Sequence, residues 1–183
     1  MSRSGESATQ YFDAALATGD YYVKEQNAGR WGGKGAERLW LSGAVTREDF
    51  MALVSNEMPG VPGKKLTVRT KEKRTAGYDW CFAVPKSVPL YLAETGDQVV
   101  ERMVEESFKE TLGDVEGRME TRVRVGDQDT DRTTAEIVYA WFVHRETRPI
   151  DGLCDPHFHI HGYVFNATFD ETENRWKAGQ FRT

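Results

Sequence analysis

The first feature that could do chemistry is a row of histidines in DGLCDPHFHIHGYVFN, residues 151–166. His157, His159 and His161 occupy alternate positions, and they are three of the four histidines in the chain. Alternate residues of a β-strand point to the same face of the sheet. Because imidazole nitrogens are common ligands of divalent metals, three on one face indicate a metal site more strongly than a solvated row of histidines.

Strand geometry limits which histidines can share one ion. Neighbouring members of the row are ~6.7 Å apart and the outer two ~13 Å apart, whereas metal–nitrogen bonds are ~2.1 Å long. One adjacent pair therefore binds, and His144 near the end of the preceding strand is the remaining histidine that can join it. Pro156 cannot donate to a sheet ladder, so regular pairing is expected to begin after it, which favours His159 and His161 over His157. Three neutral imidazoles leave coordination positions open, as catalytic metal sites do.

The order of the helices and strands expected from the sequence predicts an α+β fold, and these elements must position the histidines. Helices are expected over residues 7–18, 46–57, 87–95 and 97–113, and strands over residues 76–84, 119–126, 134–147 and 157–169. A polar turn is expected at residues 126–131. This order predicts one domain over residues 1–183, with a central antiparallel sheet and helices mainly on one face.

Strand alternation also predicts which residues share the histidine face. In the strand 134–147, His144 shares a face with Ala140 and Phe142, and Tyr139 and Trp141 point the other way. In the strand 76–84, Asp79 points away from the aromatic side chains on either side of it. Both strands are thus expected to have two faces of different character.

Composition describes the surroundings of the site. The chain has 183 residues, 39% of them hydrophobic, and a formal net charge of −5. These values suit one folded core and argue against a protein that coats nucleic acid without specificity. Two basic stretches, GKKLTVRTKEKR and GRMETRVR, matter only if the site takes a polyanion. The sequence has no membrane-spanning run and no signal-peptide core, so we expect no membrane insertion and a cytoplasmic location.

Several segments resemble the MobF-type conjugative relaxases, the TrwC/TraI-like family of HUH endonucleases. DPHFHIHGYVFNAT, with FVHRETR upstream, resembles the family's metal motif, in which a histidine and T-S-R precede D-P-x-L-H-T-H. GYDWCFAVPKSV resembles its G-x-D-L-T-F-S-x-P-K-S-V, residues 10–43 resemble its tyrosine-bearing opening, and NRWKAG resembles its G-K-W-R-A-L. The matches follow the family's order over nearly the whole chain.

The resemblance implies site- and strand-specific DNA nicking and transfer in conjugation or plasmid mobilisation. His144, His159 and His161 match the family's metal ligands, and a divalent ion is implied, manganese or magnesium first, with zinc or nickel as alternatives. The remaining alternatives are a degenerate relaxase that binds single-stranded origin DNA without cutting it, and a histidine-ligated metal oxygenase or hydrolase.

The resemblance also assigns the other catalytic groups. Tyr11 matches the nucleophile that forms a 5′-phosphotyrosyl intermediate, and Tyr21 and Tyr22 match the second pair, which resolves the transfer. Asp79 matches an aspartate beside the site, as a base or as the partner of a histidine. Ten residues precede Tyr11, so the family's short opening strand is expected to be missing or altered.

The implied partner is single-stranded origin-of-transfer DNA, bound by a monomer. Lys34, Arg69 and Lys71 are candidate contacts to the DNA backbone. In its natural context the protein is expected to work with a helicase domain or with proteins of the transfer apparatus. The domain itself is expected to be compact or C-terminally truncated relative to the family.

Overall fold

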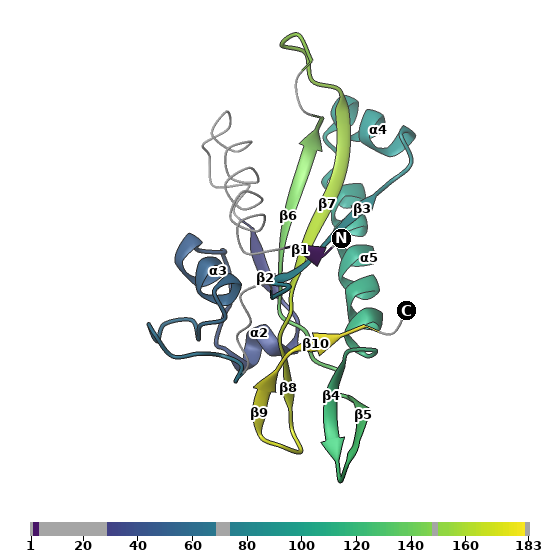
Figure 1. Ribbon diagram of the computed structural model, residues 1–183. Coiled ribbons are helices and arrows are strands. Elements are labelled where there is room, and N and C mark those ends of the chain that lie inside the picture. Colours follow the sequence, from purple (N-terminus) through teal and green to yellow (C-terminus); the bar gives the residue numbers. More distant parts are fainter. Residues whose placement is uncertain (1, 4–28, 69–73, 148–149, 182–183) are drawn as a thin grey trace.

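A computed structural model of the protein contains a five-stranded antiparallel sheet in the order β1-β3-β7-β6-β2 (Figure 1). The structure describes residues 2–3, 29–68, 74–147 and 150–181. The strands of this sheet are β1 (Ser2–Arg3), β2 (Arg30–Gly32), β3 (Gly77–Ala83), β6 (Tyr139–Glu146) and β7 (Pro156–Phe165). The α+β class with a central antiparallel sheet is therefore confirmed.

Helices cover both faces of this sheet rather than mainly one (Figure 1). α3 (Arg47–Val54) packs on one face, and α4 (Ser87–Thr95) and α5 (Gln98–Glu116) pack on the other. The short α2 (Lys34–Arg38) follows β2. None of the helices in the described ranges is long and apolar enough to cross a bilayer. We call the two sides of the sheet the α3 face and the α5 face.

Each face has its own apolar core. On the α3 face, Phe50 is fully buried against the rings of Phe142, Tyr163 and Phe165. The α5 face is formed by Phe108 and Leu112 of α5 with alternate residues of the strands: Tyr139, Trp141, Phe158, Ile160 and Val164. The alternation expected from the sequence for β6 is therefore confirmed, because neighbouring residues enter different cores.

The ends of the helices follow mostly from capping residues. The Thr46 hydroxyl accepts the N–H of Asp49 at the start of α3, and the Asp97 carboxylate caps α5. The expected end of α5 at Gly113 is wrong, because the helix runs on to Glu116. A single exposed glycine costs a helix only ~1 kcal/mol, which the contacts of the following turn offset.

Those contacts centre on the Glu116 carboxylate, which is almost fully buried. Its Oε1 accepts the N–H of Lys34 at 2.8 Å and the N–H of Ile137 at 3.0 Å. One side chain thereby joins the start of α2, the end of α5 and the segment that leads into β6. Hydrogen bonds to an ionised carboxylate are stronger than neutral ones, so this junction favours the extra turn of α5.

Two smaller sheets extend below the central one (Figure 1). The first contains β4 (Glu120–Val125), β5 (Gln128–Thr133) and β10 (Gly179–Gln180), and the second pairs β8 (Thr168–Asp170) with β9 (Arg175–Lys177). The polar turn expected at residues 126–131 is mostly strand, because β5 begins at Gln128. Almost every side chain of β5 is exposed, so its composition carries no apolar alternation that could have shown the strand.

The N-terminal strand expected to be missing or altered is present. β1 pairs with β3, with Ser2 opposite Tyr78 and Arg3 opposite Gly77. It occupies one edge of the sheet, and β2 occupies the other. Two residues are enough for this pairing, which explains why the short segment before Tyr11 did not suggest a strand.

The pairing of β6 with β7 contains an irregularity next to the histidines. His144 is opposite His159, and Glu146 is opposite Pro156. Two residues of β7, numbers 157 and 158, thus face the single residue 145 of β6, which is the pattern of a β-bulge. The expectation that pairing begins after Pro156 is wrong, since a proline is tolerated as the first residue of a strand.

Candidate metal centre

Three histidines gather on the α3 face, His144 from β6 and His159 and His161 from β7. Their ring centroids form a nearly equilateral triangle, with separations of 5.1 Å for His144–His159 and 5.2 Å for the other two pairs. Imidazoles that bind one ion at ~2.1 Å in tetrahedral directions have ring centres about 5 Å apart. The spacing of the triangle therefore fits three ligands of one ion.

The ring nitrogens of the three histidines do not converge on a common point. Within the described ranges, no group of three or more His, Cys, Asp or Glu side chains is already arranged to hold a metal ion. Rotation about the side-chain bonds would have to turn the donor nitrogens of the triangle toward its centre. The fit to a metal thus rests on the ring spacing and on the chemistry of the nitrogens.

Two of the three histidines have a hydrogen-bond partner at Nδ1, and this partner determines which tautomer is present. His161 Nδ1 lies 3.0 Å from Oδ1 of Asp79, whose side chain is 9% exposed, and His159 Nδ1 lies 2.7 Å from the carbonyl oxygen of His157. A carbonyl or carboxylate oxygen accepts, so each Nδ1 carries the hydrogen and donates it. In that tautomer Nε2 of His159 and His161 carries no hydrogen, which is the form of imidazole nitrogen that binds a metal.

The protonation state of the cluster also suits a metal. Burial, with smaller contributions from His161 and His159, lowers the pKa of His144 to about 4. Burial also lowers the pKa of His159. Both imidazoles are therefore neutral near pH 7, which is the form that binds metal ions.

The sequence motif assigns no role to His157, but in the structure its ring lies against the ring of His159. Its ring centroid lies 4.5 Å from that of His159, with 32° between the ring planes. The signal that could have shown this contact was the extra residue of the bulge, which pattern alone does not reveal.

Of the other predicted site residues, Lys34 lies within the described ranges, and it is distant from the histidines. Tyr11, Tyr21, Tyr22, Arg69 and Lys71 lie outside the described residues. Lys34 follows Gly32, which pairs with Tyr139, and about 17 Å of strand separates Tyr139 from His144. The Lys34 N–H is taken by Glu116, and its Nζ lies 3.4 Å from the carbonyl oxygen of Ala135.

Gly29, which immediately precedes β2, packs against β6 near His144. Gly29 is buried against Phe142, and a Cβ atom at Gly29 would lie 2.2 Å from that ring. Phe142 is two residues from His144 and belongs to the α3 face. Glycine is therefore required at position 29 by close packing against the α3 face.

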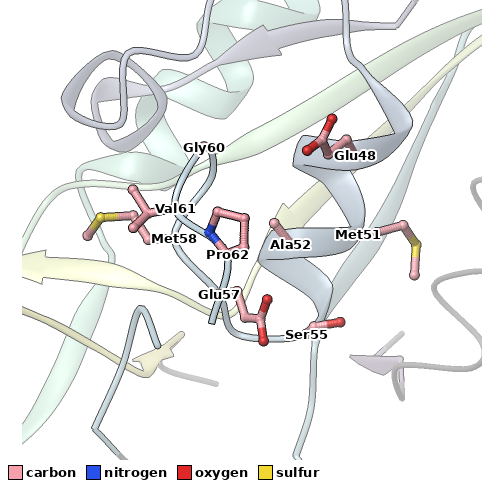
Figure 2. Close-up of a pocket in the computed structure, with 9 residues that line it drawn as sticks. All are labelled: Glu48, Met51, Ala52, Ser55, Glu57, Met58, Gly60, Val61 and Pro62. Atoms are coloured by element: carbon pink, nitrogen blue, oxygen red, sulfur yellow. The ribbon is translucent and has the colours of Figure 1, made fainter. Parts of the chain in front are cut away.

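A cavity of about 250 Å³ lies elsewhere, between α3 and the loop that follows it (Figure 2). Its lining consists of Glu48, Met51, Ala52, Ser55, Glu57, Met58, Gly60, Val61 and Pro62. None of the histidines contributes to it, and Glu57 is already paired with Lys65 at 3.0 Å. We therefore take the histidine cluster, and not this cavity, as the candidate site.

Curated sequences similar to this chain include two conjugation proteins. The chain is 29% identical over 176 residues to the multifunctional conjugation protein TraI of Escherichia coli strain K12. It is 30% identical over 176 residues to a second Escherichia coli protein of the same description. Each match covers 96% of this chain but only 10% of the relative, so the chain spans about a tenth of their length.

Solved structures similar to this chain include those of the conjugative relaxase TrwC. A copper-bound complex with oriT DNA matches with a TM-score of 0.83 and 29% identity, over 98% of this chain and 60% of that one. A metal-free complex with oriT DNA matches with a TM-score of 0.76 and 29% identity, over 92% of this chain and 57% of that one. The family model described as TrwC relaxase matches residues 5–183. The chain therefore belongs to the TrwC relaxase family.

Proposed function

We propose that this chain nicks one strand of origin-of-transfer DNA and transfers it, in conjugation or plasmid mobilisation. The observation that carries the proposal is the triangle of His144, His159 and His161 on one sheet face, in a chain of the TrwC relaxase family. Solved relatives were studied as complexes with oriT DNA, and the TraI relatives are described as conjugation proteins. The substrate class follows from this relationship.

His144, His159 and His161 are the residues that would hold a divalent ion. When bound, such an ion supplies Lewis acidity at the scissile phosphate. A copper-bound and a metal-bound complex exist among the solved TrwC structures. For this chain we keep manganese or magnesium as the expected ion in the cell, with zinc or nickel as alternatives that imidazole ligands favour.

Tyr11 is the proposed nucleophile. A bond forms between its phenolic oxygen and the phosphorus, the bond to the 3′ oxygen breaks, and a 5′-phosphotyrosyl link and a free 3′ hydroxyl result. Tyr21 and Tyr22 would make the second attack that resolves the transfer. Support comes from Gly29, where the chain that follows these tyrosines joins the α3 face two residues from His144 in strand register.

Asp79 is proposed to position His161. Its Oδ1 already accepts the Nδ1 hydrogen at 3.0 Å, which holds the ring and the tautomer that a ligand needs. This contact favours the partner role over the role of general base. Lys34, Arg69 and Lys71 stay proposed contacts to the DNA backbone, Lys34 at a point well away from the cut. We also propose that the chain acts as a monomer in the cytoplasm.

A covalent-adduct assay tests the nicking reaction. The chain is incubated with manganese or magnesium and a single-stranded oriT oligonucleotide that carries its label 3′ of the cleavage site. We expect a labelled protein band that survives denaturation and that Tyr11→Phe removes or strongly weakens. Wild-type nicking by a variant with Tyr11, Tyr21 and Tyr22 all changed to Phe contradicts the tyrosine mechanism. DNA binding without a covalent protein–DNA band supports the alternative of a degenerate relaxase that binds origin DNA without cutting it.

Metal analysis tests the ligand set separately from DNA. His159→Ala and His161→Ala are each expected to lower the bound metal more than His157→Ala does, because only the first two belong to the triangle. Metal content after dialysis, measured by elemental analysis, gives the comparison. Equal losses in all three variants contradict the assignment of His159 and His161.

A further inference from the structure

The bulge in β7 brings a fourth imidazole into contact with the triangle. His157 is one of the two residues that face the single residue Arg145 of β6. The ring centroids of His157 and His159 are 4.5 Å apart, closer than the 5.2 Å between those of His159 and His161, the next pair of alternate residues on the strand. The planes of the two rings are tilted by 32° to each other.

His157 contacts His159 in two ways. Its carbonyl oxygen accepts the Nδ1 hydrogen of His159 at 2.7 Å, and its ring packs on the ring of His159. Any residue at this position would offer the carbonyl, but only a flat side chain offers the packing. His161, by contrast, is held by the carboxylate of Asp79.

The neighbours of the bulge hold it in place. Phe158 is buried in the core of the α5 face. Arg145, opposite the bulge, pairs through Nη2 with Oε1 of Glu101 on α5. Lys86 Nζ donates to the carbonyl oxygen of Pro156 at 2.7 Å. The backbone before and after His157 is therefore fixed by contacts that do not involve its imidazole.

We propose that His157 is a positioning residue, whose ring holds the imidazole of His159 in the orientation that presents Nε2 to a metal. This inference rests on the proposed metal centre and adds to it a specific source of affinity. The Nδ1 partner of His159 is the carbonyl oxygen of His157 and not a carboxylate, so restriction of its ring by the ring of His157 takes the place that Asp79 has for His161. Partners of metal ligands typically contribute about 10- to 100-fold in metal affinity.

Three variants separate ring packing from direct use of a nitrogen. His157→Ala removes the ring, His157→Leu removes it but keeps an apolar side chain, and His157→Phe keeps a flat ring without nitrogen. Manganese and copper affinities are measured by calorimetry on the full chain without DNA. We expect about 10-fold weaker binding for Ala and Leu, and binding within about threefold of the parent for Phe.

Spectroscopy gives a second readout that a change in folding alone would not move. The electron paramagnetic resonance spectrum of bound copper should broaden or change in His157→Ala and be restored in His157→Phe. Thermal unfolding with a chelator present should be the same for the three variants and the parent. Should the alanine variant not fold, the leucine variant supplies the comparison.

The outcomes distinguish this inference from the proposed function. If the parent chain binds neither manganese nor copper, the metal centre itself is wrong. If the parent binds metal and His157→Ala and His157→Leu bind equally well, the positioning role is wrong and the metal centre stands. If His157→Phe loses as much affinity as His157→Ala, a nitrogen of His157 is used directly, which overturns the packing role.

Discussion

The α3 face of the sheet has two halves that use the same strands for different purposes. In one half, Phe142, Tyr163 and Phe165 are buried under Phe50 of α3. In the other, β6 and β7 continue for a few residues and present histidines, with no helix of the described chain packed over them. We call these the core half and the histidine half. Because the strands are continuous, packing in the core half sets the register that brings His144 opposite His159.

The largest effect is expected in the core half. Phe50→Ala should lower the free energy of unfolding by about 3–5 kcal/mol, because it removes a ring packed on Phe142, Tyr163 and Phe165 and leaves a cavity. Urea unfolding measures the loss. In the fraction that stays folded, metal affinity should change little. A large loss of affinity there would mean that the halves are not separable.

Trp40→Ala is the matched control for that change. The Trp40 side chain is 92% exposed, so its removal should alter the free energy of unfolding by no more than about 0.5 kcal/mol. A loss comparable to that of Phe50→Ala would show that the denatured state, and not the core, determines both values.

The next effect belongs to the histidine half alone. Asp79→Ala should weaken manganese binding by about 10- to 100-fold, because the Nδ1 hydrogen of His161 loses the acceptor that fixes its tautomer. Calorimetric titration measures the affinity. Cys81→Ala, on the same strand and directly opposite His161, is the control and should bind like the parent. Equal weakening in both variants would point to general disturbance of β3.

The smallest effect is a dependence of stability on pH in the metal-free protein. The pKa of His144 is about 4 when folded and ~6.5 in an unfolded chain. Between these values only the unfolded state takes up the proton, so the free energy of unfolding should fall as the pH is lowered from about 6.5 toward 4. His159, with its pKa also lowered, acts in the same direction.

Urea unfolding at pH 7 and at pH 5.5, with a chelator present, measures this dependence before most carboxylates titrate. His144→Gln should lose less stability over the interval than the parent does. The same slope in both proteins would show that His144 is not the residue responsible, and that burial of the histidine half has little energetic weight.

The division into two faces could be predicted from the sequence, because it depends on alternation within single strands. His144 and Phe142 were expected on one face and Trp141 on the other, and the structure has them so. The caps of α3 and α5 were equally local, since Thr46 and Asp97 accept hydrogen bonds from residues two or three positions away.

Features that depend on distant partners could not be predicted in this way. The bulge at His157 is a property of how β6 pairs with β7, and Arg145, which lies opposite it, pairs with the distant Glu101. The distribution of helices over both faces depends on which of the two apolar cores each helix packs against, and local sequence does not specify this. The strand β5 could not be recognised because its side chains are exposed and polar. Backbone pairing with β4 holds the strand in place.

The carboxylate of Glu116 has a consequence for the order of folding. Its two acceptor contacts join residues separated by 82 and 21 positions in the chain, so neither can form during local helix growth. Closing such long loops is entropically costly and delays the contacts that depend on them. Substitution of Glu116 should therefore speed unfolding while leaving the folding rate nearly unchanged, which is the signature of a contact made after the rate-limiting barrier.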